Sequence, residues 1–101
     1  MYKLVNHKPV LVKDTIEWAK RFEDADRVVN RTELLSDGII RKEDISISTV
    51  FLGLDHSFDG KIPLLFETMI FGGEHDQYQE RYATWEEAEK GHIEAVKLAK
   101  L

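Results

Sequence analysis

The stretch TVFLGLDHSFDGKIPLLFETMIFGG, residues 49–73, carries the strongest fold signal in this chain. Two apolar, β-prone runs flank the pair Asp59–Gly60, which suits a tight turn. The pattern predicts a central antiparallel hairpin. Four polar side chains are set into the two runs: Asp55, His56, Glu67 and Thr68. They are either a functional site or polar groups that a small sheet tolerates.

The segments around this hairpin predict the rest of an α+β fold. Residues 2–12 indicate an N-terminal hairpin in which Pro9 requires an edge strand. Residues 14–29 repeat apolar side chains at helical spacing, and residues 84–101 do so behind a capping Thr84. We expect an antiparallel sheet of about four to six strands with two helices packed on it. All 101 residues should form a single α+β domain.

Three further segments predict the other strands of this sheet. Residues 30–41 place Asp37–Gly38 between two short β-prone runs, which predicts a turn between strands. Residues 44–56 begin with strict alternation, but from Thr49 onward apolar residues fall on both faces. That change predicts a central strand covered on both sides. Residues 76–83 predict one more strand.

Composition excludes several classes of function. Lys and Arg number 14 against 19 for Asp and Glu, a net charge of −5, which argues against a surface that wraps nucleic acid. The chain has no cysteine, so disulfides, thiolate metal sites and a cysteine nucleophile are excluded. No apolar run is long enough to cross a bilayer. We expect a soluble protein that stays in the compartment where it is made, with no membrane partner.

A buried polar cluster of Glu67, His92 and Asp55 is the first candidate site. His92 occupies the centre of the apolar stripe of the last helix, so its imidazole should face the sheet. Glu67 is the expected partner, because a buried carboxylate needs one, and we predict a hydrogen bond between the two side chains. The alternative is a core histidine bonded to a single buried group. Gly91, inside the same helix, predicts close approach of another backbone.

A ligand site is the second candidate. For a small anionic ligand we predict binding by Arg81, Tyr82 and His56, because these side chains offer forked and directional hydrogen bonds. The alternative for Arg81 is a solvated charge on a strand. The candidate metal ligands are His56, His75, Asp76 and His92, but their spacing fits no established metal-binding pattern. We therefore expect no required metal and no cofactor.

Three segments carry a family resemblance: STVFLGLDHSF (48–58), PLLFETMIFGG (63–73) and RYATWEEAEKGH (81–92). In this order they resemble a widespread family of small proteins of unknown function encoded by phages and prophages. The resemblance extends from Lys8 to about Ala95 and implies a phage gene product that acts in the cytoplasm of the bacterial host. Residues 32–44 are longer and more charged than the family pattern, which indicates a specificity feature or a longer hairpin.

Two classes of function follow from the resemblance and from the lack of catalytic motifs. The first is an accessory protein that acts by stoichiometric binding, either inhibiting a host or defence protein or sequestering a small nucleotide-like signalling molecule. The second is a small hydrolase of a nucleotide-like substrate, with His56 or His92 acting beside Asp55 or Glu67 as base. A structural or assembly role in the virion is a further alternative. We expect a homodimer or larger homo-oligomer, because two helices should not cover both sheet faces.

Overall fold

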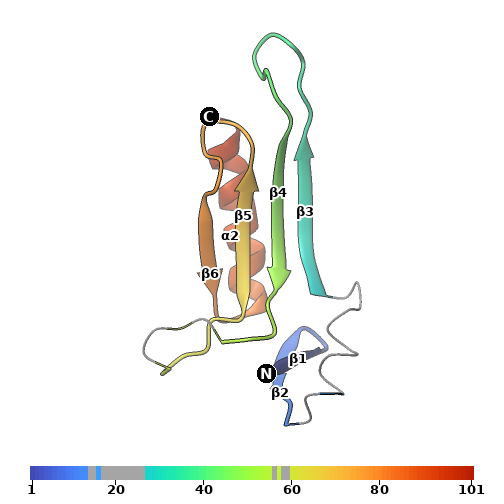
Figure 1. Cartoon of the computed structure of the whole chain (residues 1–101), viewed down its shortest axis with the longest axis vertical. Coiled ribbons are helices and arrows are strands. Elements are labelled where there is room, and N and C mark those ends of the chain that lie inside the picture. The colour runs from blue at the N-terminus through green and yellow to red at the C-terminus, as the bar shows by residue number, and fades with distance from the viewer. Residues whose placement is uncertain (14–15, 17–26, 56, 58–59) are drawn as a thin grey trace.

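The computed structural model describes residues 1–13, 16, 27–55, 57 and 60–101. Its elements are β1 (Tyr2–Val5), β2 (Lys8–Leu11), β3 (Val28–Leu34), β4 (Ile45–Phe51), β5 (Phe66–Phe71), β6 (Gln79–Tyr82) and α2 (Trp85–Ala99). β1 and β2 form the predicted N-terminal hairpin. The other strands form an antiparallel sheet in the order β3-β4-β5-β6, with α2 on one face (Figure 1). The α+β class is confirmed.

The prediction of two helices packed on the sheet is not matched. Most of the first predicted helix, 14–29, lies outside the described residues. Its last two residues, Val28 and Val29, belong to β3 instead. Both are β-branched, and such side chains fit a pleated strand better than a helix. The part of the chain that the structure describes contains one helix, α2.

The two central strands keep a strict alternation of buried and part-exposed side chains. In β4 every second residue is buried, and Thr49 lies directly opposite Thr68 of β5. The alternation continues to Phe51 and leaves Val50, which is half-buried, on the face away from α2. We call that face the outer face. The predicted covering of both faces from Thr49 onward is therefore not seen among the described residues. The buried residues of the two strands are Ile45, Ile47, Thr49, Phe51, Phe66, Thr68 and Ile70.

Helix α2 begins where the sequence predicts. The Thr84 hydroxyl accepts a hydrogen bond from the backbone N–H of Glu87 at 3.1 Å, which satisfies one of the free donors of the first turn. Glu86 and Glu87 in the first turn and Lys97 in the last suit the helix dipole. The helix contacts all four strands of the large sheet, so it is the layer that closes the core.

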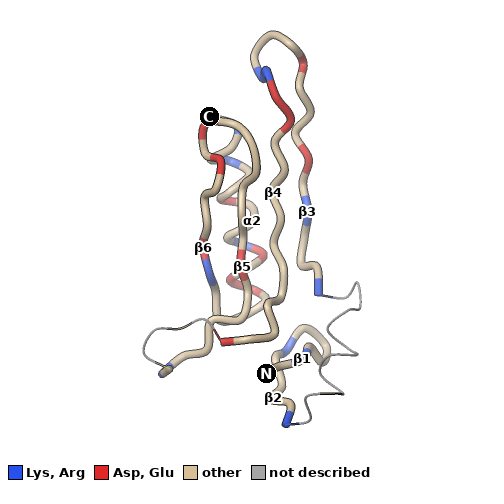
Figure 2. Tube along the Cα trace, viewed as in Figure 1, with Lys and Arg blue, Asp and Glu red and all other residues tan. Residues whose placement is uncertain are grey.

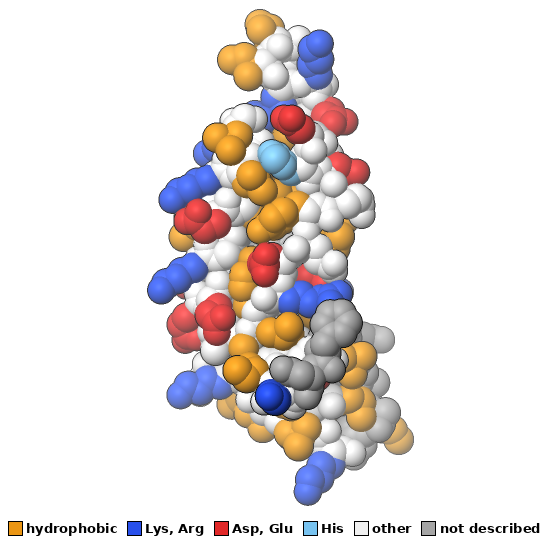
Figure 3. All heavy atoms as spheres, turned by 90° about the vertical axis from the view of Figure 1, so that its left-hand side faces the viewer, with side chains coloured by type: hydrophobic (Ala, Val, Ile, Leu, Met, Phe, Trp, Pro, Cys, Tyr) orange, Lys and Arg blue, Asp and Glu red, His pale blue; other side chains and the backbone are white. Residues whose placement is uncertain are grey.

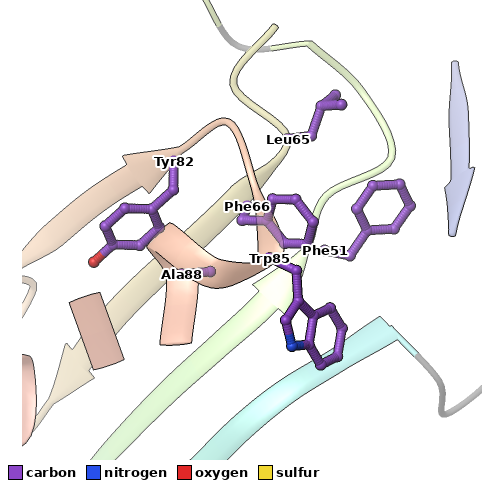
Figure 4. Packing of buried hydrophobic residues seen from close by; sticks show 6 residues of the cluster. All are labelled: Phe51, Leu65, Phe66, Tyr82, Trp85 and Ala88. Atoms are coloured by element: carbon purple, nitrogen blue, oxygen red, sulfur yellow. The ribbon is translucent and has the colours of Figure 1, made fainter. Parts of the chain in front are cut away.

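An aromatic cluster joins the start of α2 to the sheet and to the N-terminal hairpin. Trp85 meets Phe66 edge to face, with ring centroids 6.2 Å apart. On the other side its ring stacks on His7 of the β1–β2 turn, with centroids 3.8 Å apart. The hairpin is tied further by a 2.7 Å hydrogen bond from the backbone of Tyr2 to that of Gly53. The buried members of this cluster are Phe51, Leu65, Phe66, Tyr82, Trp85 and Ala88 (Figure 4).

Gly91 is needed for a side chain to pack, and the predicted approach of another backbone is wrong. A Cβ at this position would overlap the hydroxyl and ring of Tyr82, which lie against the helix backbone. Tyr82 enters from β6, so the glycine lets the edge strand pack under α2. Glycine lowers the intrinsic helix propensity at this position, but its lack of a Cβ lets the Tyr82 ring pack against the helix backbone.

We predict that Gly91→Ala destabilises the protein by about 1–3 kcal/mol, because the added methyl group overpacks against Tyr82. Urea unfolding of the variant would measure this cost. The matched control is the same substitution in a Tyr82→Leu background, where space is available and alanine should be neutral or stabilising by up to about 1 kcal/mol. An unchanged free energy of unfolding for Gly91→Ala alone would contradict the prediction.

Candidate functional site

The structure separates the residues of the predicted buried polar cluster. Glu67 and Thr68 are neighbours in β5, so Thr68 faces α2 and Glu67 lies on the outer face. There the Glu67 carboxylate accepts a hydrogen bond from the guanidinium of Arg81 at 2.9 Å. The predicted hydrogen bond between Glu67 and His92 is therefore wrong.

Asp55, the third member of that cluster, is also elsewhere. It lies in the loop after β4 and is exposed. Its carboxylate organises this loop by accepting the backbone N–H groups of Ser57 at 2.8 Å and Leu64 at 3.0 Å. The residue has a local structural role and does not join His92.

The predicted ligand residues also fall on different faces. Arg81 points to the outer face and is paired with Glu67, whereas Tyr82 is buried under α2. Adjacent residues of a strand project in opposite directions, so these two side chains cannot contact the same small ligand. His56 lies outside the described residues.

His92 is held by hydroxyl groups instead of a carboxylate. Its side chain is buried, its Nε2 lies 2.8 Å from the hydroxyl of Thr32, and its Nδ1 lies 2.7 Å from the hydroxyl of Thr49. The Thr49 hydroxyl also bonds that of Thr68 at 2.5 Å. These four residues, which we call the His92 network, join α2 to β3, β4 and β5.

The protons in the His92 network are constrained by its geometry. A neutral imidazole has one N–H donor and one nitrogen acceptor, so one threonine donates to the ring while the other accepts from it. Burial lowers the pKa of His92 below 6.5, which keeps the ring neutral near pH 7. His92, Thr49 and Thr68 are buried between α2 and the sheet, and Thr32 is half-buried on β3, so the network supports the fold.

Tyr82 ends beside this network with an unsatisfied group. Its hydroxyl is buried and has no hydrogen-bond partner within the described residues. Burial raises the pKa of the phenol. The predicted role of Tyr82 in ligand binding is replaced by packing against Gly91.

The loop between β3 and β4, residues 35–44, is the strongest candidate for a binding surface. It extends beyond the end of α2 and of the other strands (Figure 1). Asp37 orders it, because its Oδ1 accepts the backbone N–H groups of Ile39 at 2.9 Å, Ile40 at 2.9 Å and Arg41 at 3.0 Å. These bonds lower the pKa of Asp37 below 3.8, and the bond from Ile39 has the largest effect. The carboxylate therefore stays charged near pH 7.

Further hydrogen bonds hold the base of the 35–44 loop. Ser36 donates its backbone N–H to the carboxylate of Asp44 at 2.7 Å and its hydroxyl to the carbonyl of Arg41 at 2.9 Å. Glu43 accepts the backbone N–H of Gly73 at 2.6 Å, which links the loop to the turn after β5. The loop is therefore ordered before any partner arrives.

This ordered loop presents aliphatic side chains to solvent. Leu35 is 68% exposed, Ile39 83% and Ile40 89%. The predicted strand after Asp37–Gly38 is wrong, because the Asp37 carboxylate captures the backbone donors that a strand would use. Figure 3, viewed from the β6 side, shows hydrophobic side chains at the end of the molecule where this loop lies.

A shallow groove of about 270 Å³ runs beside the 35–44 loop. Its apolar walls include Ile40, Ile45 and Ala99. Its charged walls carry both signs: Arg41, Lys42 and Lys100 beside Glu43 and Glu74. Lys42 and Lys100 form no ion pair within the described residues. Sequence reasoning singled out this region only by its length and charge. The signal it missed was the pair of adjacent isoleucines after an Asp–Gly turn.

Metal ligands are not gathered among the described residues. Within 1–13, 16, 27–55, 57 and 60–101, no three His, Asp or Glu side chains are close enough together to hold an ion. Of the four candidates, His75 and Asp76 lie in the turn after β5, and His92 lies in α2 and faces the sheet. In the same part of the chain, no helix has the length and apolar character needed to span a membrane.

Comparison with known proteins gives no match. No protein-family model, no curated protein and no solved structure is similar to this chain.

We predict that the free energy of unfolding falls as the pH drops below 6.5, because of His92. The unfolded chain takes up a proton near pH 6.5, whereas the folded chain, in which the pKa of His92 is lower, does not. Stability from this group is complete above pH 6.5 and declines below it by at most about 1.4 kcal/mol per pH unit. Urea titrations between pH 7.5 and about 5 would measure the slope.

Two histidine variants separate this effect from general acid sensitivity. His92→Gln cannot titrate, so its stability should be flatter across the same pH range, whatever its absolute value. His75→Gln, in an external turn, is the matched control for the loss of one histidine outside the His92 network. Equal slopes for the wild type and His92→Gln would show that His92 does not control the acid response.

Proposed function

We propose that this protein is a phage-encoded accessory protein that acts in the bacterial host by stoichiometric binding. We propose further that its target is a host or defence protein, contacted by the 35–44 loop. The observation that carries this proposal is an internally hydrogen-bonded loop that exposes three aliphatic side chains: Leu35, Ile39 and Ile40. The phage origin and the host compartment rest on the resemblance of residues 48–58, 63–73 and 81–92 to phage proteins.

The order of the loop is what makes its exposed side chains suited to binding. Clustered exposed aliphatic residues are costly in water and mark interaction surfaces. A loop that is already fixed loses little conformational entropy when it binds, so more of the contact energy appears as affinity. Asp37 supplies that order by accepting three backbone donors. The loop therefore meets both requirements of an anchor for a partner.

A protein partner fits this surface better than a small nucleotide-like ligand does. The groove beside the loop, about 270 Å³, lies just under the usual range for small-molecule sites of roughly 300–1,000 Å³. Its exposed aliphatic rim suits an apolar pocket on another protein. Arg81 and Tyr82, which were expected to hold an anion, lie on opposite faces of the sheet. Sequestration of a small molecule is thus the alternative outcome of the test.

The test compares loop variants for capture and affinity. The protein would be immobilised and exposed to host lysate, and the captured target would be identified by mass spectrometry, purified and titrated. Replacing both Ile39 and Ile40 with Asp should weaken binding at least about hundredfold, as expected for the loss of two anchors. Asp37→Ala keeps the aliphatic side chains but removes the acceptor that orders them. We expect it to weaken binding about tenfold.

The matched control is Ile62→Asp, because Ile62 is 65% exposed but lies in a different loop. It should bind like the wild type. Thermal melts would confirm that every variant is folded. The proposal is overturned if the double loop variant keeps wild-type affinity. It is also overturned if heating the protein releases a stoichiometric amount of an intact nucleotide, or if a cleaved product exceeds the amount of protein.

A further inference from the structure

β3 is an edge strand of the large sheet within the described residues. It pairs with β4 on one side, and no described strand lies on the other. It spans the seven residues Val28–Leu34 and contains no proline. An edge of this length offers a row of backbone donors and acceptors to another strand.

The backbone N–H of Arg31 is bonded to a side chain that another strand could displace. The backbone N–H of Arg31 donates to the side-chain oxygen of Asn30 at 2.8 Å. A side chain on the same strand can move aside, so a carbonyl of an added strand can take its place. The Arg31 donor is thus satisfied in one copy and remains able to pair.

Charges on β3 select the strand that would fit. The guanidinium of Arg31 and the carboxylate of Glu33 lie 2.9 Å apart, and their side chains are 67% and 45% exposed. Figure 2 shows the positive and negative positions next to each other on this strand. Opposite charges directly across a pair of antiparallel strands stabilise the pair, and like charges destabilise it.

Self-pairing of β3 about a twofold axis has three central registers. An axis at Arg31 would place two arginines opposite each other, and an axis at Glu33 would place two glutamates opposite each other. An axis at Thr32 places Arg31 of each copy opposite Glu33 of the other. The intermediate registers are excluded, because facing residues must project to the same face of the sheet.

From this charge pattern we propose that the protein forms a homodimer in which β3 pairs antiparallel with β3 of a second copy, with the twofold axis at Thr32. Residues 30–34 of the two copies form the ladder, and the two four-stranded sheets become one continuous sheet. The Arg31–Glu33 pairs of both copies join into a four-charge group on the outer face. The antiparallel arrangement places the two 35–44 loops at opposite ends of the dimer.

The other edge strand, β6, is a poorer candidate. It spans only four residues, Gln79–Tyr82, and short edges resist pairing. An axis at Glu80 opposes two glutamates, and an axis at Arg81 opposes two arginines. The Arg81 guanidinium is also already bonded to Glu67. The same charge rule that favours β3 therefore disfavours β6.

Charge reversal tests the interface through the dissociation constant of the dimer, measured by sedimentation or light scattering over a range of concentrations. Arg31→Glu opposes two pairs of glutamates, and Glu33→Arg opposes two pairs of arginines. Each should weaken the dimer about tenfold or more, since each changes two cross-strand pairs at once. The double variant with both changes restores opposite charges and should return to within about threefold of the wild type.

Lys90→Glu is the matched control, because it changes the net charge as Arg31→Glu does but lies on the exposed side of α2. It should leave the dimer unchanged. Circular dichroism would verify that all variants are folded. A wild-type protein that stays monomeric at high micromolar concentration overturns the proposal. The proposal is also overturned if neither single charge reversal raises the dissociation constant of the dimer. It is overturned too if the double variant dimerises no more tightly than the single variants. The test does not depend on the proposed host target.

Discussion

The hydrogen bonds of His92 to Thr32 and Thr49 fix the position of α2 on the sheet. Each bond links the helix to a different strand, so a slide or rotation of α2 would break both together. The imidazole of His92 and the hydroxyl of Thr49, both buried, would then lose their partners, as would the half-buried hydroxyl of Thr32. A buried polar group without a partner costs about 1–3 kcal/mol, so alternative placements of the helix are strongly disfavoured.

Because α2 packs on one face of the sheet, that face forms the core. The outer face, the β3 edge and the 35–44 loop are not covered by α2. Thr49 and Thr68 point inward, so their neighbours in sequence, including Glu67, must point outward. The outer face then carries ion pairs: Glu67 with Arg81 and Arg31 with Glu33. The features suited to partners lie at the margins of the sheet, in the 35–44 loop and along the edge of β3.

The two proposed surfaces, the β3 edge and the 35–44 loop, are adjacent in sequence but would bind through different interactions. The 35–44 loop offers apolar contact that is ordered in advance by Asp37, which favours affinity. The β3 edge offers backbone hydrogen bonds and charges whose order selects one register, which favours specificity. If both operate, a dimer would present two loops at opposite ends, and a target with repeated subunits would bind it more tightly than it binds one copy.

Features that depend on residues close together along the chain could be predicted from the sequence. The Thr84 cap, helix α2 and the N-terminal hairpin follow from local periodicity and turn chemistry, and the pairing of β4 with β5 follows from their two apolar runs. The tight turn predicted at Asp59–Gly60 does not join these strands, because β4 ends at Phe51 and β5 begins at Phe66. The sequence also implied that Glu67 and Thr68 lie on opposite faces of the sheet, because adjacent residues of a strand project in opposite directions. The contacts of His92 with Thr32 and Thr49, and the packing of Tyr82 against Gly91, could not be predicted in this way. Those contacts depend on the angle and height at which α2 crosses four strands, which no local pattern encodes.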